Sequence, residues 1–337
     1  MAETRFYRID NAGNLVSFPD LQSAQAGKGG YLWIDMASPD RETLQPLARA
    51  LGVHPLSAKD CLDKAKVPKM DAFPDTTFLL FNSVRHDGGR LGFGEIDLIL
   101  GRGFLLTVSG FTGEDQRFRE RLAVKLKTNA EELAKGPDML LHMLLDHVVD
   151  QKAGPVESIE AEMESAEEEI LKNPATFKLG RLVALRRQLL QLRRSLFYER
   201  ETLVKLCRRD SPLVGEHAVY HFRDIYDHIT RYFEEAELLR EMLLSLMEMH
   251  LTLMNNRMSA TANRTNDTVR RLTFITTIFM PLTLLAGVGG MSEWTMMTGA
   301  QNWKAAYPVF MGLMVVIGTA TYFALRWIEG RSKGPKA

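Results

Sequence analysis

The sequence predicts an α/β domain followed by helical segments, one very long helix and two C-terminal transmembrane helices. Three observations support this prediction. Strand-like runs end near residue 135, helical periodicity takes over from Asp138, and two long uncharged stretches close the chain. The 337 residues leave room for two or three domains and a sizeable core.

Residues 1–135 form the predicted cytoplasmic α/β domain. Ser38-Pro39-Asp40 predicts a helix start, with Ser38 as N-cap and proline at the first helical position, and that helix is expected to run to Gly52. A second helix is expected after His54-Pro55. The runs rich in Tyr, Phe, Ile and Thr that predict strands are Arg5–Ile9, Gly30–Met36, Thr76–Val84, Gly94–Leu100 and Gly103–Val108.

Residues 136–213 form the predicted helical part, which contains an acidic helix and a basic helix joined at Asn173-Pro174. The arginines alone suggest RNA or lipid head groups, and the glutamates alone suggest metal binding. We favour antiparallel helices that neutralise one another, which also fits the balance of 42 basic and 42 acidic residues. The charged residues are Glu157, Glu160, Glu162, Glu164, Glu167, Glu168 and Glu169, then Arg181, Arg186, Arg187, Arg193, Arg194 and Arg200.

Residues 214–291 form the predicted stalk helix, which continues into the first transmembrane helix at about 272–291. Between Glu216 and Val288 the only proline is Pro281, and no glycine occurs before Gly287. At 1.5 Å per residue this is a helix of about 100 Å. Such a helix cannot lie within one compact domain, so we expect it to leave the cytoplasmic domain and enter the membrane.

Two uncharged stretches, Leu272–Ser292 and Ala305–Leu325, each have the length that a helix needs to cross a bilayer. A buried soluble hairpin is the alternative, and two such stretches in succession disfavour it. We expect residues 292–304 to form a short external loop, 305–327 the second transmembrane helix and 328–337 a basic cytoplasmic tail. The flanking basic residues place both termini in the cytoplasm by the positive-inside rule. They are Arg264, Arg270, Arg271, Arg326, Arg331, Lys333 and Lys336.

The composition excludes several function classes. A formal net charge of zero argues against a nucleic-acid-binding protein. Cys61 and Cys207 are too far apart in sequence for a zinc knuckle, and we expect two buried thiols. We find no Ser-His-Asp pattern, phosphate-binding glycine loop or zincin motif, so an enzyme is not expected.

One face of the first transmembrane helix carries small and hydroxyl-bearing residues. At 100° per residue this face spans an arc of roughly 100°, and Phe274, Ile278, Leu282 and Leu285 lie on the other side. Small residues are typical of close helix packing in membranes, whereas hydroxyls around a methionine are typical of a water-filled pore. Periodicity alone leaves both interpretations open. The residues of this face are Asn266, Val269, Thr273, Thr276, Met280, Thr283 and Gly287.

The end of this helix predicts a site that attracts cations. Glycines in the run from Gly287 to Glu293 free the last carbonyls at the negative end of the helix dipole, and a ring of Glu293 around a symmetry axis adds charge. Gly290, Met291, Ser292 and Glu293 therefore form the expected outer mouth. Neither transmembrane stretch contains a carboxylate, which suits a partly hydrated ion such as Mg²⁺.

Histidines on the stalk helix form a second candidate metal site. His217, His221, Asp224 and His228 share one helix face, and imidazoles at i and i+4 can provide half a zinc site. Polar residues at a helix interface are the alternative, which we favour over a regulatory site.

The ordered motifs resemble the CorA-type divalent-cation transporters along nearly the whole chain. The resemblance implies a funnel-shaped homopentamer in the plasma (inner) membrane, with the first transmembrane helix of each subunit lining one central pore. It implies no cofactor beyond divalent cations, with Mg²⁺ as the default substrate. The motifs are Trp33-Ile34-Asp35, His54-Pro55-Leu56, Asp60, Pro68-Lys69, 222–228, 263–266, Leu272-Thr273, 279–283 and 287–292.

One position departs from the family pattern. The family has Gly-Met-Asn after the pore helix, and this chain has Gly290-Met291-Ser292. Serine is shorter and offers a hydroxyl in place of an amide carbonyl. This resembles the ZntB-like zinc transporters and makes Zn²⁺, Co²⁺ or Ni²⁺ competitors of Mg²⁺. The alternative function is a membrane-tethered scaffold or sensor that conducts poorly.

Overall fold

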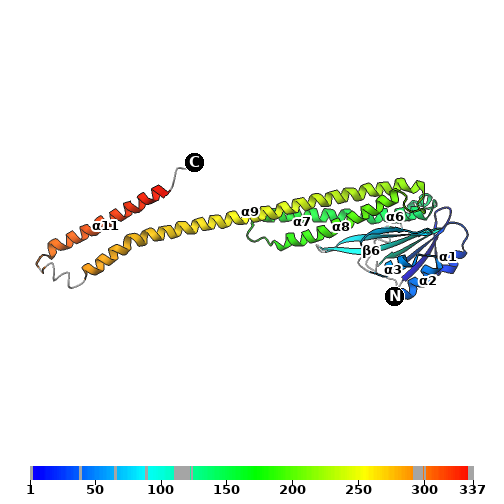
Figure 1. The fold of residues 1–337 in the computed structure, drawn as a ribbon, viewed down its shortest axis with the longest axis horizontal. Coiled ribbons are helices and arrows are strands. Elements are labelled where there is room, and N and C mark those ends of the chain that lie inside the picture. Colours follow the sequence, from blue (N-terminus) through cyan, green and yellow to red (C-terminus); the bar gives the residue numbers. More distant parts are fainter. Residues whose placement is uncertain are drawn as a thin grey trace. The chain divides into compact units, whose positions relative to one another are not determined.

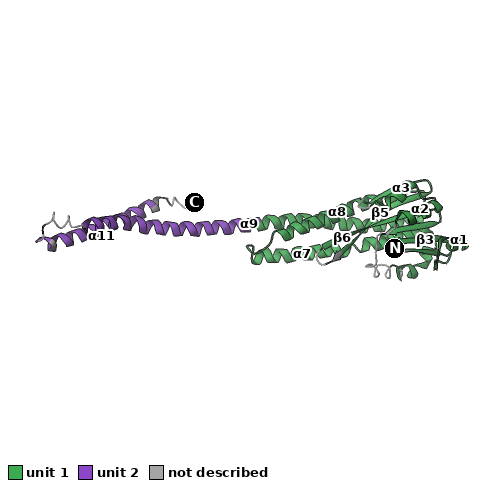
Figure 2. Ribbon diagram, turned by 90° about the horizontal axis from the view of Figure 1, so that it is seen from below, with its two compact units in different colours: residues 1–250 green, residues 251–337 purple. Residues whose placement is uncertain are grey.

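A computed structural model describes residues 3–37, 40–63, 67–87, 90–109, 122, 124–290, 299 and 301–332. The chain divides into two compact units, residues 1–250 and residues 251–337 (Figure 2).

The first unit is built on one seven-stranded sheet with the order β2-β1-β3-β7-β6-β5-β4. Every neighbouring pair is antiparallel except β3 and β7, which are parallel. The strands are β1 (Glu3–Ile9), β2 (Leu15–Phe18), β3 (Tyr31–Ala37), β4 (Lys69–Ala72), β5 (Thr76–Asp87), β6 (Arg90–Gly101) and β7 (Phe104–Ser109).

Helices cover both faces of this sheet (Figure 1). On one face, side chains such as Leu44 and Ala58 pack with Ile34, Phe78 and Leu106 in one apolar cluster. On the other face, α6, α7 and α8 contact the central and β4-side strands. The helices of the first group are α1 (Leu21–Ala26), α2 (Arg41–Ala50) and α3 (Pro55–Asp60), and those of the second are α6 (Pro137–Asp150), α7 (Ala153–Lys172) and α8 (Gly180–Cys207).

The five predicted strands are present, but β2, β4 and α1 were not predicted. The expected N-cap of α2 was wrong. Asp40 is the cap. Its carboxylate accepts a hydrogen bond from the backbone N–H of Thr43, and its own backbone N–H donates to the Thr43 hydroxyl. Ser38 and Pro39 lie outside the described residues.

His54 caps the second predicted helix. Its Nδ1 accepts from the Leu56 N–H at 3.3 Å, and its ring stacks on Phe73 at 3.9 Å between centroids. The His54-Pro55 pair therefore starts α3 and anchors it next to β4. Cys61 and Cys207 are half-buried and are not joined in a disulfide, so the expectation of two buried thiols was wrong.

The charged hairpin is present, but its charges do not neutralise one another as expected. Of the arginines and glutamates named above, Arg181 of α8 pairs with Glu169 of α7 at 3.1 Å. Arg193 pairs instead with Glu237 of the long helix α9 (Glu216–Gly289). Apolar side chains hold the hairpin in place, because each helix buries a row of them and leaves most of its charges exposed.

One ion pair in this unit is completely buried. Lys152, at the start of α7, lies 3.1 Å from Glu199 of α8, and both side chains have no exposed surface. The ammonium group also donates to the Asn82 carbonyl, and Glu199 accepts from the Asn82 N–H at 3.0 Å and from the Ser195 hydroxyl at 3.0 Å. Burial raises the pKa of Glu199, and the Lys152 ammonium opposes that rise. The network joins β5, α7 and α8.

The second unit contains the end of α9 (Glu216–Gly289) and α11 (Trp303–Ser332). Both helices are long and apolar enough to cross a membrane, and none of the apolar stretch of either one is buried. A core helix of a soluble protein would be mostly buried, so exposure favours membrane-spanning helices. The two helices are antiparallel, because Gly289 lies against Phe310 whereas Leu282 lies against Gly318.

Candidate functional site

The candidate site is the face of α9 that does not pack on α11. Phe274, Ile278, Leu282 and Leu285, expected on the opposite side, are half-buried, as are Phe310 and other α11 residues. The face therefore remains available to a partner or to water. Asn266, Val269, Thr273, Thr276, Met280, Thr283 and Gly287 are all exposed, Met280 to 69%.

The threonines of this face use their hydroxyl protons within the helix. Thr273 donates to the Val269 carbonyl at 2.9 Å, and Thr276 and Thr283 each donate at 2.8 Å to the carbonyl four residues earlier. A hydroxyl oxygen keeps two lone pairs when its proton is engaged. The three threonine hydroxyls of this face therefore offer hydrogen-bond acceptors rather than donors.

A shallow hollow of about 570 Å³ lies near the end of this face. Met280, Thr283 and Gly287 of this face line it together with Leu284 and Val288. Leu284 and Val288 were not predicted as part of this face, because they are bulky and apolar. Helical periodicity could have predicted Leu284 and Val288, because at 100° per residue they lie close to Asn266 and Gly287 around the helix.

The terminal glycines have different roles. A Cβ atom at Gly287 would meet nothing within 4 Å, whereas one at Gly289 would lie 2.7 Å from the Phe310 ring. Gly289 therefore allows close packing with α11, and Gly287 lies on the open face. α9 continues unbroken through Pro281, which has no N–H for the Thr277 carbonyl. Gly290 closes the helix with a 3.0 Å bond to the Ala286 carbonyl.

Most of the predicted mouth lies outside the described residues. Met291, Ser292 and Glu293 are the mouth residues that lie outside the described part of the chain. Their role stays a prediction.

The stalk histidines are spread along the contact between α9 and earlier helices. His217 lies 3.4 Å from Asp138, His221 3.8 Å from Glu132 and His228 3.8 Å from Asp150. These are three separate carboxylate contacts. Asp224 is exposed. The structure therefore does not bring His217, His221, Asp224 and His228 to one point.

Within the described part of the chain, the one group of three metal-ligating side chains is Asp146, Asp150 and His228, with ligand atoms within 4.8 Å of one another. The ammonium group of Lys125 contacts Asp146 and lies 3.6 Å from Asp150. A metal ion at this position must displace that internal cation. The regulatory metal site stays a prediction.

His142 of α6 lies beside these groups and is neutral at pH 7. Burial lowers its pKa to about 4, although Asp146 opposes this effect. Its ring lies 5.0 Å from that of His221.

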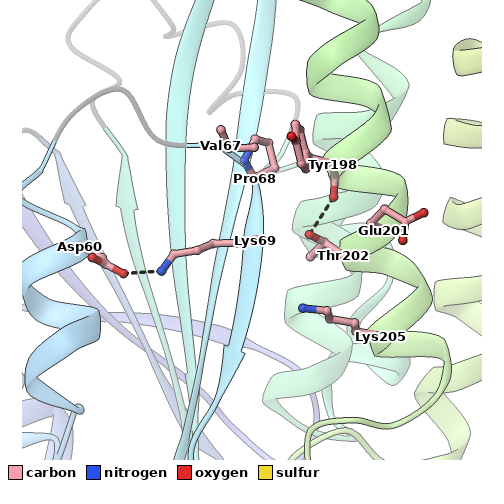
Figure 3. A pocket seen from close by; sticks show the side chains of 8 residues that line it. All are labelled: Asp60, Val67, Pro68, Lys69, Tyr198, Glu201, Thr202 and Lys205. Carbon is pink, nitrogen blue, oxygen red and sulfur yellow. Dashed lines mark hydrogen bonds and ion pairs between the residues drawn. The ribbon is translucent and has the colours of Figure 1, made fainter.

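A separate groove of about 480 Å³ lies between the β4 region and α8 (Figure 3). Lys69 lies in it but is neutralised by Asp60 at 2.6 Å and Asp71 at 2.5 Å. Lys205 on α8 reaches the Met70 carbonyl at 3.5 Å. The Asp60–Lys69 pair thus fixes α3 to β4. The groove lining is Asp60, Val67, Pro68, Lys69, Tyr198, Glu201, Thr202 and Lys205.

Comparison with known proteins identifies the family. The model of the CorA-like Mg²⁺ transporter protein family matches residues 28–326. This chain belongs to that family. The cobalt/magnesium transport protein CorA of Thermotoga maritima is 31% identical over 307 residues, which cover 88% of this chain and 83% of the relative.

Solved structures share the CorA fold. The complete CorA magnesium transporter of Methanocaldococcus jannaschii superposes with a TM-score of 0.71 at 20% identity and covers 98% of both chains. The ZntB cytoplasmic domain of Vibrio parahaemolyticus matches with a TM-score of 0.61 at 12% identity, over 75% of this chain and 98% of that one. The chain is thus a membrane protein of a divalent-cation transporter family, and it is not an enzyme.

Proposed function

We propose that this protein moves hydrated divalent cations through a pore that the exposed α9 faces of a homopentamer enclose, with Mg²⁺ as the principal substrate. The observation that carries this proposal is the exposed face from Asn266 to Gly287, which lies opposite the packing face toward α11. One chain with two transmembrane helices cannot enclose a channel, so copies must surround it. Five is the number that the resemblance to CorA-type transporters implies.

The chemistry of the face suits an ion that keeps its water. The water molecules around a cation point their hydrogens outward, and the threonine oxygens accept such hydrogen bonds. Mg²⁺ gives up its water reluctantly, so a face of neutral acceptors suits it better than a bare carboxylate cage.

The mouth determines the choice among cations in this proposal. Gly290, Met291, Ser292 and Glu293 collect the ion, with Glu293 attracting cations from outside. Ser292 replaces the family asparagine with a shorter group, so Zn²⁺, Co²⁺ and Ni²⁺ compete with Mg²⁺. The relative from Thermotoga maritima is named for cobalt and magnesium transport.

We place the protein in the plasma membrane with both termini in the cytoplasm. Arg264, Arg270 and Arg271 precede the first apolar stretch and Arg326 follows the second. This distribution supports the orientation through the positive-inside rule.

Cation flux into liposomes tests the proposal. Purified protein is reconstituted with Mg²⁺- or Zn²⁺-sensitive dye inside, with and without a pH gradient. We expect Mg²⁺ entry that exceeds the rate of empty liposomes. Zn²⁺ flux with little Mg²⁺ flux would contradict the assigned substrate, and no flux of either ion from intact oligomers would favour the scaffold or sensor.

A further inference from the structure

The two helices of the charged hairpin leave complementary outer faces uncovered. On α8, residues 179–201 present an arc of about 120° at 100° per residue. Val183, Leu190 and Phe197 recur along it at intervals of seven residues and are 45%, 43% and 38% exposed. Three exposed arginines lie on the same arc, namely Arg186, Arg187 and Arg194.

The outer face of α7 carries the opposite charge. Its members are the exposed residues Glu157, Glu160, Ala161, Glu164, Glu167, Glu168 and Leu171. Glu168 pairs with Lys172 of its own helix at 2.9 Å. For the described part of the chain, no other ion pair engages the carboxylates of this face or the three arginines of the α8 face.

We propose that the outer face of α8 in one copy packs against the outer face of α7 in the neighbouring copy of the oligomer. The inference rests on the proposed oligomeric transporter. The two faces are complementary rather than self-complementary. Such a contact repeats head to tail, and it closes a ring in the oligomer that the proposed function requires. The exposed apolar residues between the arginines would add buried apolar surface to this contact, as in the core of a protein interface.

The positions of the charges along the hairpin agree with this contact. The Arg181–Glu169 pair shows which residues of the two antiparallel helices lie at the same distance from the turn. On that alignment Glu164 lies within one residue of the level of Arg187, and Glu157 within one residue of the level of Arg194, an offset of about 1.5 Å. Rotation about an axis along the helices keeps these distances from the turn, so each arginine of one copy meets a glutamate of the next.

Cross-linking of two distinguishable copies tests the contact. Full-length chains with Cys61→Ser and Cys207→Ser are coexpressed, one tag with Ala161→Cys and another tag with Leu190→Cys. Because each chain carries one cysteine, a disulfide between the tags forms only between copies. We expect a mixed-tag dimer on mild oxidation.

Charge reversal provides the matched control. Arg187→Glu with Arg194→Glu should abolish the mixed-tag dimer, and adding Glu157→Arg with Glu164→Arg should restore it. All four positions are exposed, so melting curves should stay unchanged. Failure of the second pair to restore the dimer would overturn the proposal.

Other outcomes separate this inference from the proposed function. Oligomers that conduct but give no mixed-tag dimer would refute the α7–α8 contact and leave the transporter intact. Protein that neither assembles nor conducts would refute both. If Leu190→Cys is protected from a thiol reagent in phosphatidylglycerol vesicles but not in phosphatidylcholine vesicles, and no mixed-tag dimer forms, the α8 face binds anionic lipid instead.

Discussion

Replacing Lys152 with methionine is expected to lower the free energy of unfolding by about 3–5 kcal/mol, because the change leaves Glu199 buried without its counter-charge. Both side chains have no exposed surface, and Glu199 already accepts from the Asn82 N–H. Denaturant titration of the full-length protein in detergent measures the change. Lys172→Met is the matched control, because the Lys172–Glu168 pair is about three-quarters exposed and contributes little.

The double variant Lys152→Met, Glu199→Gln separates charge from shape. Glutamine keeps an acceptor for the Asn82 N–H and carries no charge, so we expect it to recover part of the lost stability. A loss below about 1 kcal/mol in Lys152→Met would show that the pair behaves like an exposed one. The account of the buried network would then be wrong.

Replacing Gly287 with phenylalanine is expected to reduce cation flux to the rate of empty liposomes. A Cβ atom at this position meets nothing within 4 Å in the single chain and Gly287 is exposed, so we expect the variant to fold. In a ring of copies, however, the phenylalanines converge on the axis and block it. Flux in reconstituted liposomes measures the effect.

Gly312→Phe on α11 is the matched control for this block. A Cβ atom at Gly312 also meets nothing within 4 Å. Gly312, however, lies on the side of α11 that faces away from Phe310 and from the packing with α9. We expect this variant to conduct as the wild type does. Equal flux in both variants would contradict the assignment of the Gly287 face to the pore.

Much of the fold could be predicted from local sequence patterns, because the central strands and membrane helices carry long apolar runs. Strands β2 and β4 escaped prediction because each has four residues, lies at an edge of the sheet and is mostly not buried. The cap of α2 depends on the reciprocal Asp40–Thr43 hydrogen bonds, which the Ser38-Pro39-Asp40 pattern alone does not reveal.

For the candidate site, too, a local sequence pattern was informative. Helical periodicity separates the Thr276 face from the Ile278 face, and the packing of α9 on α11 agrees with that separation. The partners of charged residues were not predictable, because they depend on tertiary packing. No sequence pattern singles out Lys152, which is fully buried. The hairpin arginines were expected to pair with the glutamates, but Arg186, Arg187 and Arg194 are exposed.

Cysteine scanning of α9 tests most directly whether its exposed hydroxyl face lines the ion pathway. Single cysteines are placed in a Cys61→Ser, Cys207→Ser background at Thr273, Thr276, Met280 and Thr283, and at Phe274, Ile278 and Leu285. A cationic thiol reagent is added while flux into liposomes is followed. Block at the first four positions and not at the other three is the predicted result. Block at Phe274, Ile278 and Leu285, or at none of the seven positions in conducting protein, would contradict the account.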